Sequence, residues 1–520
     1  MGIVSSIIQF IKKMKTIFMK IKYAIFFSLL AVILACQQEP KESHDDKEVL
    51  EQSEEDVRLA YSAKDFLSGN QILIQNITVI DGLGNAPKTN QDIFIKDGKI
   101  QSITKTGQIE PSSSAEVIDG TGQTAMPGLI DMHFHLKGGW AGGNAMAEKY
   151  PADVSSKGIQ QNLAALLYSG VTTALDMGST HSFIVREKKK IDEGYYISPR
   201  YHIVGVPFSQ TPSGWDGAVR AETVGEPQPD ALSTKIETDD LEKIGAILQK
   251  YQDDGISIIK LYSGISAHAA TFLINEANKR NITTVADLWK LNMSSDWMRT
   301  SNLNGWAHAT PNPVSFEGLK WMVENDKFVI ATMNVGEKMS GMRVKDENGS
   351  EAIFNNPLVM DIWGKEVVRD FYDSYSDVRE TLYEGQHSFY QMNNFGDLSE
   401  FRDLFADNIR RAHEAGVLIA GGTDAPAYPS LWAGETMHRE LELFAMAGIP
   451  PLEAIKMCTF NAAKILKDED KYGSLQEGLI ADIVLVSGKP WENISDTRNV
   501  HIVLLNGKLL DRKKMLTSWK

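Results

Sequence analysis

Apolar and polar residues alternate with two different periods along this 520-residue chain. From about residue 72, runs such as ILIQNITVIDG and DIFIKDG alternate with period two and end at turn pairs such as Asp97-Gly98, which predicts strands joined by hairpins. The same pattern returns near the other end of the chain, in ADIVLVSG and VHIVLLNGKLL. We therefore predict one small β-sandwich built from both ends of the chain, over 70–128 and 468–520.

Between these ends, over 129–467, short apolar runs alternate with amphipathic segments whose apolar residues recur at helical spacing. The alternation predicts an α/β fold, a (β/α)8 TIM barrel inserted in the sandwich. An aromatic-rich segment over about 336–396 is predicted to be a helical insertion, either a lid over the barrel or a peripheral subdomain with its own core. The eight predicted strands are 129–135, 171–177, 200–206, 256–262, 282–288, 305–309, 327–333 and 417–422.

The first 36 residues differ from the rest of the chain. A lysine-rich stretch precedes an apolar run at 23–34, which is short for a membrane span and ends in Ala35-Cys36. This arrangement resembles the signal segment and lipobox of bacterial lipoproteins. It predicts lipidation at Cys36 and an exported protein, anchored in the membrane on the periplasmic face or the cell surface of a bacterium. An ordinary signal peptide or a single anchor helix is the alternative, and a charged tether is expected over 37–69.

The charge balance excludes one class of partner. The formal net charge is -15, whereas a protein that binds nucleic acid needs a basic surface. No nucleic-acid partner is therefore expected. No pattern in the sequence indicates an oligomeric state.

Polar residues stand at the ends of several predicted strands, where a barrel of this type carries its functional side chains. His133 and His135 end the first strand one residue apart, so both imidazoles face the same side. Lys260, His308 and Asp424 stand at the ends of the fourth, sixth and eighth strands. A lone lysine or histidine often has a purely structural role. Several such residues at different strand ends predict a metal site.

The chain resembles the amidohydrolase superfamily of metal-dependent hydrolases, in its imidazolonepropionase-like and prolidase-like branch, over about residues 70–515. The resemblance rests on PGLIDMHFH, GVTTALDMG, IIKLYSG, GWAHA, GGTDAP, HRELELFAMAGIPPLEAIKMCTFNAAKIL and GSLQEGLIADIVLVSG. It implies one or two divalent metal ions, Zn²⁺ foremost. It assigns the first ion to His133 and His135, and the second ion to His308. It also makes Asp424 a contact of the first ion, a general base and a proton shuttle.

The resemblance further implies that Lys260 bridges the two ions as a carbamate (a carboxylysine) formed with CO₂. The chemistry is sound, because burial lowers the pKa of a lysine and the neutral amine can add CO₂ to become an anion with two oxygens. Those oxygens can span two ions about 3.5–4 Å apart.

The fifth strand departs from the family pattern, since Asp287 stands where a histidine ligand is expected. Asp287 can replace the imidazole as an oxygen ligand, which is the interpretation we favour. The second metal site can instead be weak or empty, or the protein can be catalytically impaired. Mononuclear deaminases of the superfamily keep this histidine and lack the bridging lysine, so the pattern with Lys260 favours hydrolysis.

We predict a hydrolase that cleaves a C–N bond with a metal-activated hydroxide. The expected substrate is a small amide, such as a dipeptide or a cyclic amide. The alternatives are a catalytically impaired surface lipoprotein that binds a small ligand, and a lactone or phosphotriester hydrolase. Tyr262, His202 and Arg220 are candidate substrate contacts, because they lie on the predicted fourth strand, on the third strand and on the loop after the third strand.

Overall fold

The computed structural model describes ten segments of the chain, all within one compact unit spanning Leu59–Lys520. The predicted signal segment, with Cys36, lies outside the described residues. Among the helices that are described, none is both long and apolar enough to cross a bilayer. The described segments are 62–136, 156–179, 181–208, 241–262, 265–287, 295–310, 313–339, 355–370, 398–426 and 431–517.

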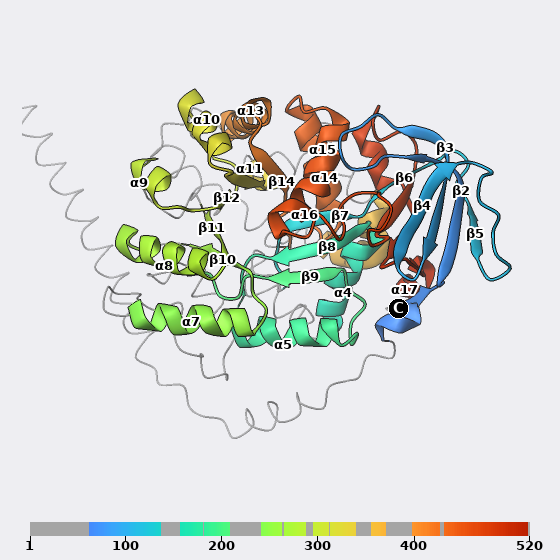
Figure 1. Cartoon of the computed structure of the whole chain (residues 1–520), viewed down its shortest axis with the longest axis horizontal. Helices are drawn as coiled ribbons and strands as arrows, with labels where there is room; N and C mark the ends of the chain where they lie inside the picture. Colours follow the sequence, from blue (N-terminus) through green and yellow to red (C-terminus); the bar gives the residue numbers. More distant parts are fainter. Residues whose placement is uncertain are drawn as a thin grey trace, which may run out of the picture. The chain divides into compact units, whose positions relative to one another are not determined.

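A nine-stranded sheet combines strands from both ends of the chain (Figure 1). Strand β15 pairs antiparallel with β6, with Val484 opposite Met126, so the C-terminal strands extend the N-terminal ones. Its strands are β1 (Leu67–Ser68), β2 (Gln71–Val79), β3 (Lys88–Lys96), β4 (Lys99–Lys105), β5 (Glu116–Asp119), β6 (Gln123–Pro127), β15 (Ile483–Ser487), β16 (Val500–Leu505) and β17 (Lys508–Leu510).

The structure assigns these strands to one sheet, whereas the sequence pattern predicted a two-sheet sandwich. Alternation of apolar residues identifies a strand and its buried face, but the partner strand depends on pairing between residues far apart in the chain. Residues 62–69, at the end of the predicted tether, are folded. They form the 3₁₀ turn η1 (Ala63–Phe66) and β1, which pairs with β17, and the side chain of Phe66 is buried.

All eight strands predicted for the middle of the chain are present, and all pair in parallel. They form two sheets, ordered β7-β8-β9 and β10-β11-β12-β13-β14. Two isolated parallel bridges, Phe134 with Ala425 and Phe208 with Leu261, connect the sheets. The strands are β7 (Leu129–Phe134), β8 (Val171–Asp176), β9 (Arg200–Ile203), β10 (Ile258–Leu261), β11 (Thr283–Asp287), β12 (Gly305–Ala307), β13 (Phe328–Ala331) and β14 (Leu418–Gly421).

Helices alternate with these strands, and Figure 1 shows α5, α7 and α8 beside β8, β9 and β10. In α8 the side chain of Ser266 accepts a hydrogen bond from the backbone N–H of Ala269, which caps the helix start. The helices are α4 (Ser156–Tyr168), α5 (His181–Asp192), α7 (Leu241–Asp253), α8 (Ala267–Lys279), α9 (Ser295–Thr300), α10 (Phe316–Glu324), α11 (Met333–Met339), α13 (Leu398–Ala415), α14 (Glu435–Met446), α15 (Pro451–Met457), α16 (Phe460–Leu466) and α17 (Arg512–Thr517).

Part of the predicted insertion is described, and residues 357–370 of it are helical. This helix packs on α4, where the hydroxyl of Tyr168 donates to the carboxylate of Asp361 at 2.7 Å. The side chains of Val359 and Val368 are buried against Trp432. This part of the insertion therefore shares an apolar cluster with the rest of the fold.

Candidate metal centre

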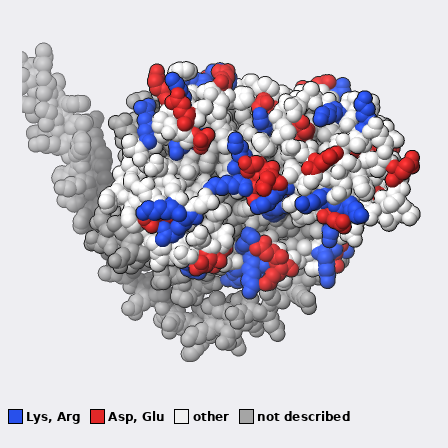
Figure 2. Space-filling view, viewed as in Figure 1, with Lys and Arg blue, Asp and Glu red and all other residues white. Residues whose placement is uncertain are grey.

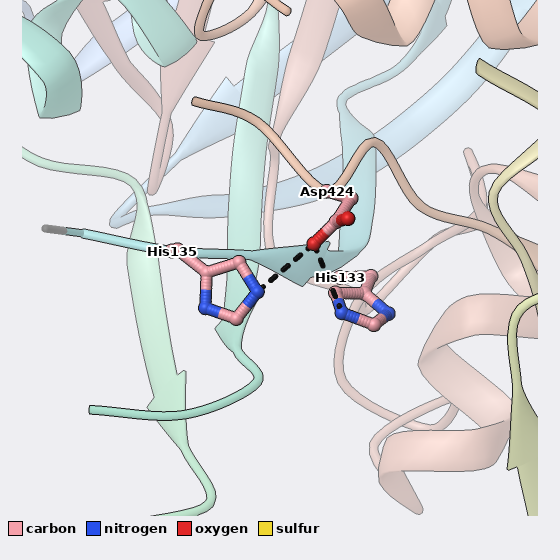
Figure 3. A group of neighbouring side chains, drawn as sticks. All are labelled: His133, His135 and Asp424. Atoms are coloured by element: carbon pink, nitrogen blue, oxygen red, sulfur yellow. Dashed lines mark hydrogen bonds and ion pairs between the residues drawn. The ribbon is translucent and has the colours of Figure 1, made fainter. Parts of the chain in front are cut away.

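Three buried side chains converge at the carboxyl ends of the first and last parallel strands (Figure 3). The Oδ1 atom of Asp424 lies 3.0 Å from Nε2 of His135 and 3.4 Å from Nε2 of His133. The three residues expose 6% of their surface or less. Each offers one potential ligand atom, and all of these atoms lie within 4.8 Å of one another.

The backbone around β7 and β14 brings the three residues together. The carbonyl oxygen of His133 accepts a hydrogen bond from the N–H of Asp424 at 2.6 Å, and the N–H of His135 donates to the carbonyl of Ala425 at 2.9 Å. Gly422 permits this close approach, because a Cβ atom there would lie 2.6 Å from Cβ of His133. Asp424 has a φ of 57°, in the left-handed region that few non-glycine residues adopt.

A second pair of potential ligands lies next to this group. The Nε2 atom of His308, just after β12, lies 3.3 Å from Oδ2 of Asp287 at the end of β11. The ring of His308 also lies 4.6 Å, centroid to centroid, from the ring of His133. Nδ1 of His308 lies 2.7 Å from the hydroxyl of Thr332. The structure therefore places Asp287 beside His308, where it is 3% exposed.

Lys260 completes the set that the sequence predicted. It lies on β10, next to β11, and is 4% exposed. Its Nζ atom lies 3.4 Å from Nε2 of His133 and 5.3 Å from the ring centroid of Tyr262. Lys260 thus lies on β10, the strand next to that of Asp287, and contacts His133 of the first group.

The donor set fits a divalent ion. Two donors that each lie about 2.1 Å from an ion, in a tetrahedral arrangement, are about 3.4 Å apart. The spacings of 3.0 and 3.4 Å between Asp424 and the two histidines are close to that value. Burial lowers the pKa of His133 well below its usual range. The imidazole is therefore neutral, which is the form that binds a metal ion.

Two buried carboxylates that the sequence analysis did not single out support this group. Asp131 accepts hydrogen bonds from the N–H of His133 at 3.1 Å and from the hydroxyl of Thr423 at 2.6 Å. Asp176 accepts from the N–H of Leu136 at 2.8 Å, just after His135. Burial raises the pKa of Asp131 to about 7. The sequence did offer a signal for Asp131 and Asp176. Each is a charged residue inside an otherwise apolar strand, and a buried charge needs hydrogen-bond partners.

His202 does not join the group. It lies six positions before Phe208, the residue at the end of this segment that bridges to β10. Its Nε2 atom lies 3.1 Å from the hydroxyl of Tyr472. Tyr472 packs with residues of α16 in the core between the strands. The side chain of His202 therefore lies away from the ligands, and burial lowers its pKa to about 4. Arg220 lies outside the described residues.

A cavity of about 670 Å³ lies elsewhere, at the amino ends of β11 to β14. The candidate ligands follow the carboxyl ends of these strands, so the cavity is remote from them. Four lysines line it, and the ends of α8, α10 and α13 face it through Asn278, Val323 and His413. Cations are favourable near the carbonyl groups at helix C-termini, which accounts for lysines at this place. The four lysines are Lys327, Lys456, Lys464 and Lys467.

The face of the molecule drawn in Figure 2 carries acidic and basic side chains interspersed.

Known proteins resemble this chain in both sequence and fold. A dihydroorotase of Thermoanaerobacter sp. (strain X514) is 43% identical over 67 residues, which are 13% of this chain and 14% of that protein. An N-acetylglucosamine-6-phosphate deacetylase of Lysinibacillus sphaericus is 29% identical over 129 residues, 25% of this chain and 30% of that protein. The chain thus spans less than a third of the length of these two curated relatives.

Similarity in fold extends over much more of the chain. The crystal structure of a Xaa-Pro dipeptidase with bound methionine in the active site has a TM-score of 0.63. It covers 84% of this chain and 99% of its own, at 22% identity. The sequence pattern of the amidohydrolase family matches residues 124–301 and 402–510, which together are more than half of the chain. The chain therefore belongs to the amidohydrolase family.

Proposed function

We propose that this protein is a metal-dependent hydrolase that cleaves the C–N bond of a small amide. The observation that carries the proposal is the convergence of His133, His135 and Asp424, at the spacing of metal ligands, in a chain of the amidohydrolase family. The relatives include a dihydroorotase, a deacetylase and a dipeptidase, which supports hydrolysis of C–N bonds as the class of reaction.

We also propose that the two parallel sheets are parts of one closed eight-stranded barrel. The bridge between Phe134 and Ala425 joins the first strand to the last, and the bridge between Phe208 and Leu261 joins the third to the fourth. In such a barrel all of the candidate ligands lie at the carboxyl ends of the strands. The division into a barrel over 129–467 and a β-domain over 70–128 and 468–520 belongs to this proposal.

In the proposed reaction, His133, His135 and Asp424 would hold the first ion. A divalent ion held there would polarise the carbonyl of the substrate and lower the pKa of water. Asp424 also takes a proton from the attacking water at its carboxylate and delivers it to the leaving amine. Burial of all three side chains keeps bulk water away, which strengthens the electrostatic interactions at the site.

For Lys260 we propose a carbamate, formed when the neutral amine adds to CO₂ and releases one proton. The new N–C bond leaves an anion with two oxygen atoms beside His133 and β11. Burial of the lysine to 4% exposure supports the neutral amine that this step needs. Such a carbamate would offer its two oxygen atoms to ions held by His133 and His135 and by His308 and Asp287.

For the second ion we propose Asp287 as an oxygen ligand in place of the usual imidazole. Its Oδ2 atom lies 3.3 Å from Nε2 of His308, again a spacing that two ligands of one ion adopt. A buried carboxylate with a metal partner avoids the desolvation cost that it would carry alone. Zn²⁺ is the proposed metal, since it accepts nitrogen and oxygen ligands together.

The substrate proposed is a dipeptide, another small amide or a cyclic amide, and Tyr262 beside Lys260 is the proposed contact for it. We further propose that the protein is an exported lipoprotein, anchored through Cys36 to a bacterial membrane. Incubation of the full chain with radiolabelled palmitate in a bacterial host tests the anchor, because a Cys36→Ala variant should lose the label.

Metal analysis and hydrolysis assays test the activity. The purified protein should hold at least one transition metal ion per chain, and should hydrolyse members of a panel of dipeptides and cyclic amides. Activity should disappear on chelation and return with Zn²⁺. An Asp424→Asn variant should lose about 10²–10⁴-fold in kcat, because general acid–base catalysis contributes that much. A protein that takes up neither zinc nor manganese would contradict the proposal.

A further inference from the structure

The two histidines of the candidate metal centre are held in different ways. Nδ1 of His135 lies 3.1 Å from the carbonyl oxygen of Gly178, so a hydrogen bond fixes the orientation of its ring. Nδ1 of His133 is buried, and within the described part of the chain it has no hydrogen-bond partner. Metal-binding histidines usually depend on a partner at the second nitrogen for ring orientation. The position of His133 must therefore be fixed through another part of the residue.

The backbone of His133 supplies that connection. Oδ1 of Asp131 accepts hydrogen bonds from the N–H of His133 and from the N–H of Thr423, both at 3.1 Å. Oδ2 of the same carboxylate accepts from the hydroxyl of Thr423 at 2.6 Å. Asp131 is completely buried. One carboxylate thus joins the end of β7, which carries His133, to the segment after β14, which carries Asp424.

The hydroxyl of Thr423 also links the residues on either side of Asp424 in the chain. Thr423 precedes Asp424, and its hydroxyl oxygen accepts a hydrogen bond from the N–H of Ala425, which follows it. The φ of 57° at Asp424 is unfavourable by itself and persists only where the surrounding structure holds it. The hydroxyl of Thr423 and the carboxylate of Asp131 provide this restraint.

We propose that Asp131, acting with Thr423, is a positioning residue that holds His133 and Asp424 at the ligand spacing of the first metal site. It fixes the backbone of His133, whose Nδ1 has no hydrogen-bond partner among the described residues. Asp131 does not itself bind the ion, because its hydrogen bonds go to His133 and Thr423 of the protein. This inference rests on the proposed function, since it assumes that the first site binds a metal ion.

Cobalt binding tests the inference without an activity assay. The full chain is stripped of metal, and the affinity for Co²⁺ and the visible spectrum of the bound ion are measured for the wild type, Asp131→Asn, Thr423→Val and Thr423→Ser. The expected result is that Asp131→Asn and Thr423→Val bind Co²⁺ about 10–100-fold more weakly, with an altered spectrum, as is usual when a residue that orients a ligand is changed. Thr423→Ser, which keeps the hydroxyl, should resemble the wild type.

Asp92→Asn is the matched control. Asp92 is also completely buried and accepts hydrogen bonds from two backbone N–H groups, those of Asn76 and Gly107, within the nine-stranded sheet. Its substitution should lower the melting temperature but leave the affinity and the spectrum unchanged. Should Asp131→Asn fail to fold, the two Thr423 variants test the positioning role by themselves. The role then requires weaker Co²⁺ binding in Thr423→Val than in Thr423→Ser.

Two results would overturn the inference, and they differ in meaning. Wild-type affinity and spectrum in both Asp131→Asn and Thr423→Val would refute the positioning role alone. Absence of Co²⁺ binding by the wild type would refute the proposed function and this inference with it.

Discussion

The carboxylate of Asp424 lies 3.0 Å from the imidazole of His135, although 289 positions of the chain separate the two residues. Contact between them depends on pairing of the chain across the ends of β7 and β14, where Phe134 bridges to Ala425. The approach of these two candidate ligands therefore depends on the contact between the ends of β7 and β14.

Zinc should stabilise the protein through this site. At a free Zn²⁺ concentration about 100 times Kd, the free energy of unfolding of the metal-stripped protein should rise by about 2.7 kcal/mol, because the ion binds only the folded state. Urea unfolding with and without Zn²⁺ measures the change. A His135→Asn variant should lose most of this stabilisation, while His501→Asn, which changes an exposed histidine in the nine-stranded sheet, should keep it. Equal stabilisation of the two variants would contradict the assignment of the site.

The second metal site should respond to the residue at position 287. An Asp287→His variant places a longer, nitrogen-bearing side chain beside His308, so it should bind a second equivalent of Zn²⁺ more tightly than the wild type. Asp287→Asn, which keeps the size but removes the charge, should bind that equivalent more weakly. Calorimetric titration of metal-stripped protein gives both stoichiometries. Unchanged stoichiometry and affinity in both variants would mean that position 287 does not serve a metal ion.

A methyl group at Gly422 should disturb the first site. The Cβ atom of a Gly422→Ala variant would lie 2.6 Å from Cβ and 2.9 Å from the backbone nitrogen of His133, so one of the two segments must shift. We expect a loss of about 1–3 kcal/mol in the free energy of unfolding, together with weaker metal binding. Gly245→Ala is the control, because its Cβ would meet only the end of Arg280, at 3.8 Å, within helix α7. That variant should be neutral or slightly stabilising.

Acid should destabilise the protein partly through His438. This residue is 1% exposed and lies on α14, where its Nε2 is 2.8 Å from the carbonyl oxygen of Ser169. Burial, and then the charge of Arg498, lower its pKa to about 4. Between a pH of about 6.5, its unfolded pKa, and about 4, the unfolded state binds a proton that the folded state does not, so stability falls as the pH falls.

A His438→Gln variant isolates this contribution. From pH 7 to pH 5 the wild type should lose about 2 kcal/mol more of its free energy of unfolding than the variant, since each unit of pH in that window costs about 1.4 kcal/mol. Urea unfolding at the two pH values measures the difference. Identical pH dependence in the two proteins would show that His438 takes up a proton in the folded state.

The sequence was sufficient to predict the parallel strands and the close approach of most of the candidate ligands. Eight apolar runs correspond to β7 to β14, and His133, His135, Lys260 and Asp424 lie together as their positions at strand ends suggested. Each of these inferences used local information, namely an apolar run and the polar residue that ends it. Asp287 and His308, which also stand at the ends of predicted strands, likewise lie beside each other.

The parts that the sequence analysis missed depend on contacts between distant segments. His202 was a candidate substrate contact because it lies on a strand, but its depth along that strand places it beside Tyr472. The partnership of Asp131 with Thr423 joins residues 292 positions apart, and no local pattern specifies it. A β-domain built from both ends of the chain was predicted, but the specific pairing of β6 with β15 was not, since it joins strands far apart in the sequence.

The wide separation of the ligands along the chain also sets the order of events during biosynthesis. His133 and His135 leave the ribosome early, but Asp424 and the Thr423 hydroxyl that restrains it follow almost three hundred residues later. Strand β6 precedes the two histidines in the chain, but its partner strand β15 is synthesised only after Asp424. During synthesis, the two imidazoles are therefore present for almost three hundred residues before the carboxylate of Asp424, so the proposed metal site would be completed only late in the synthesis of this protein.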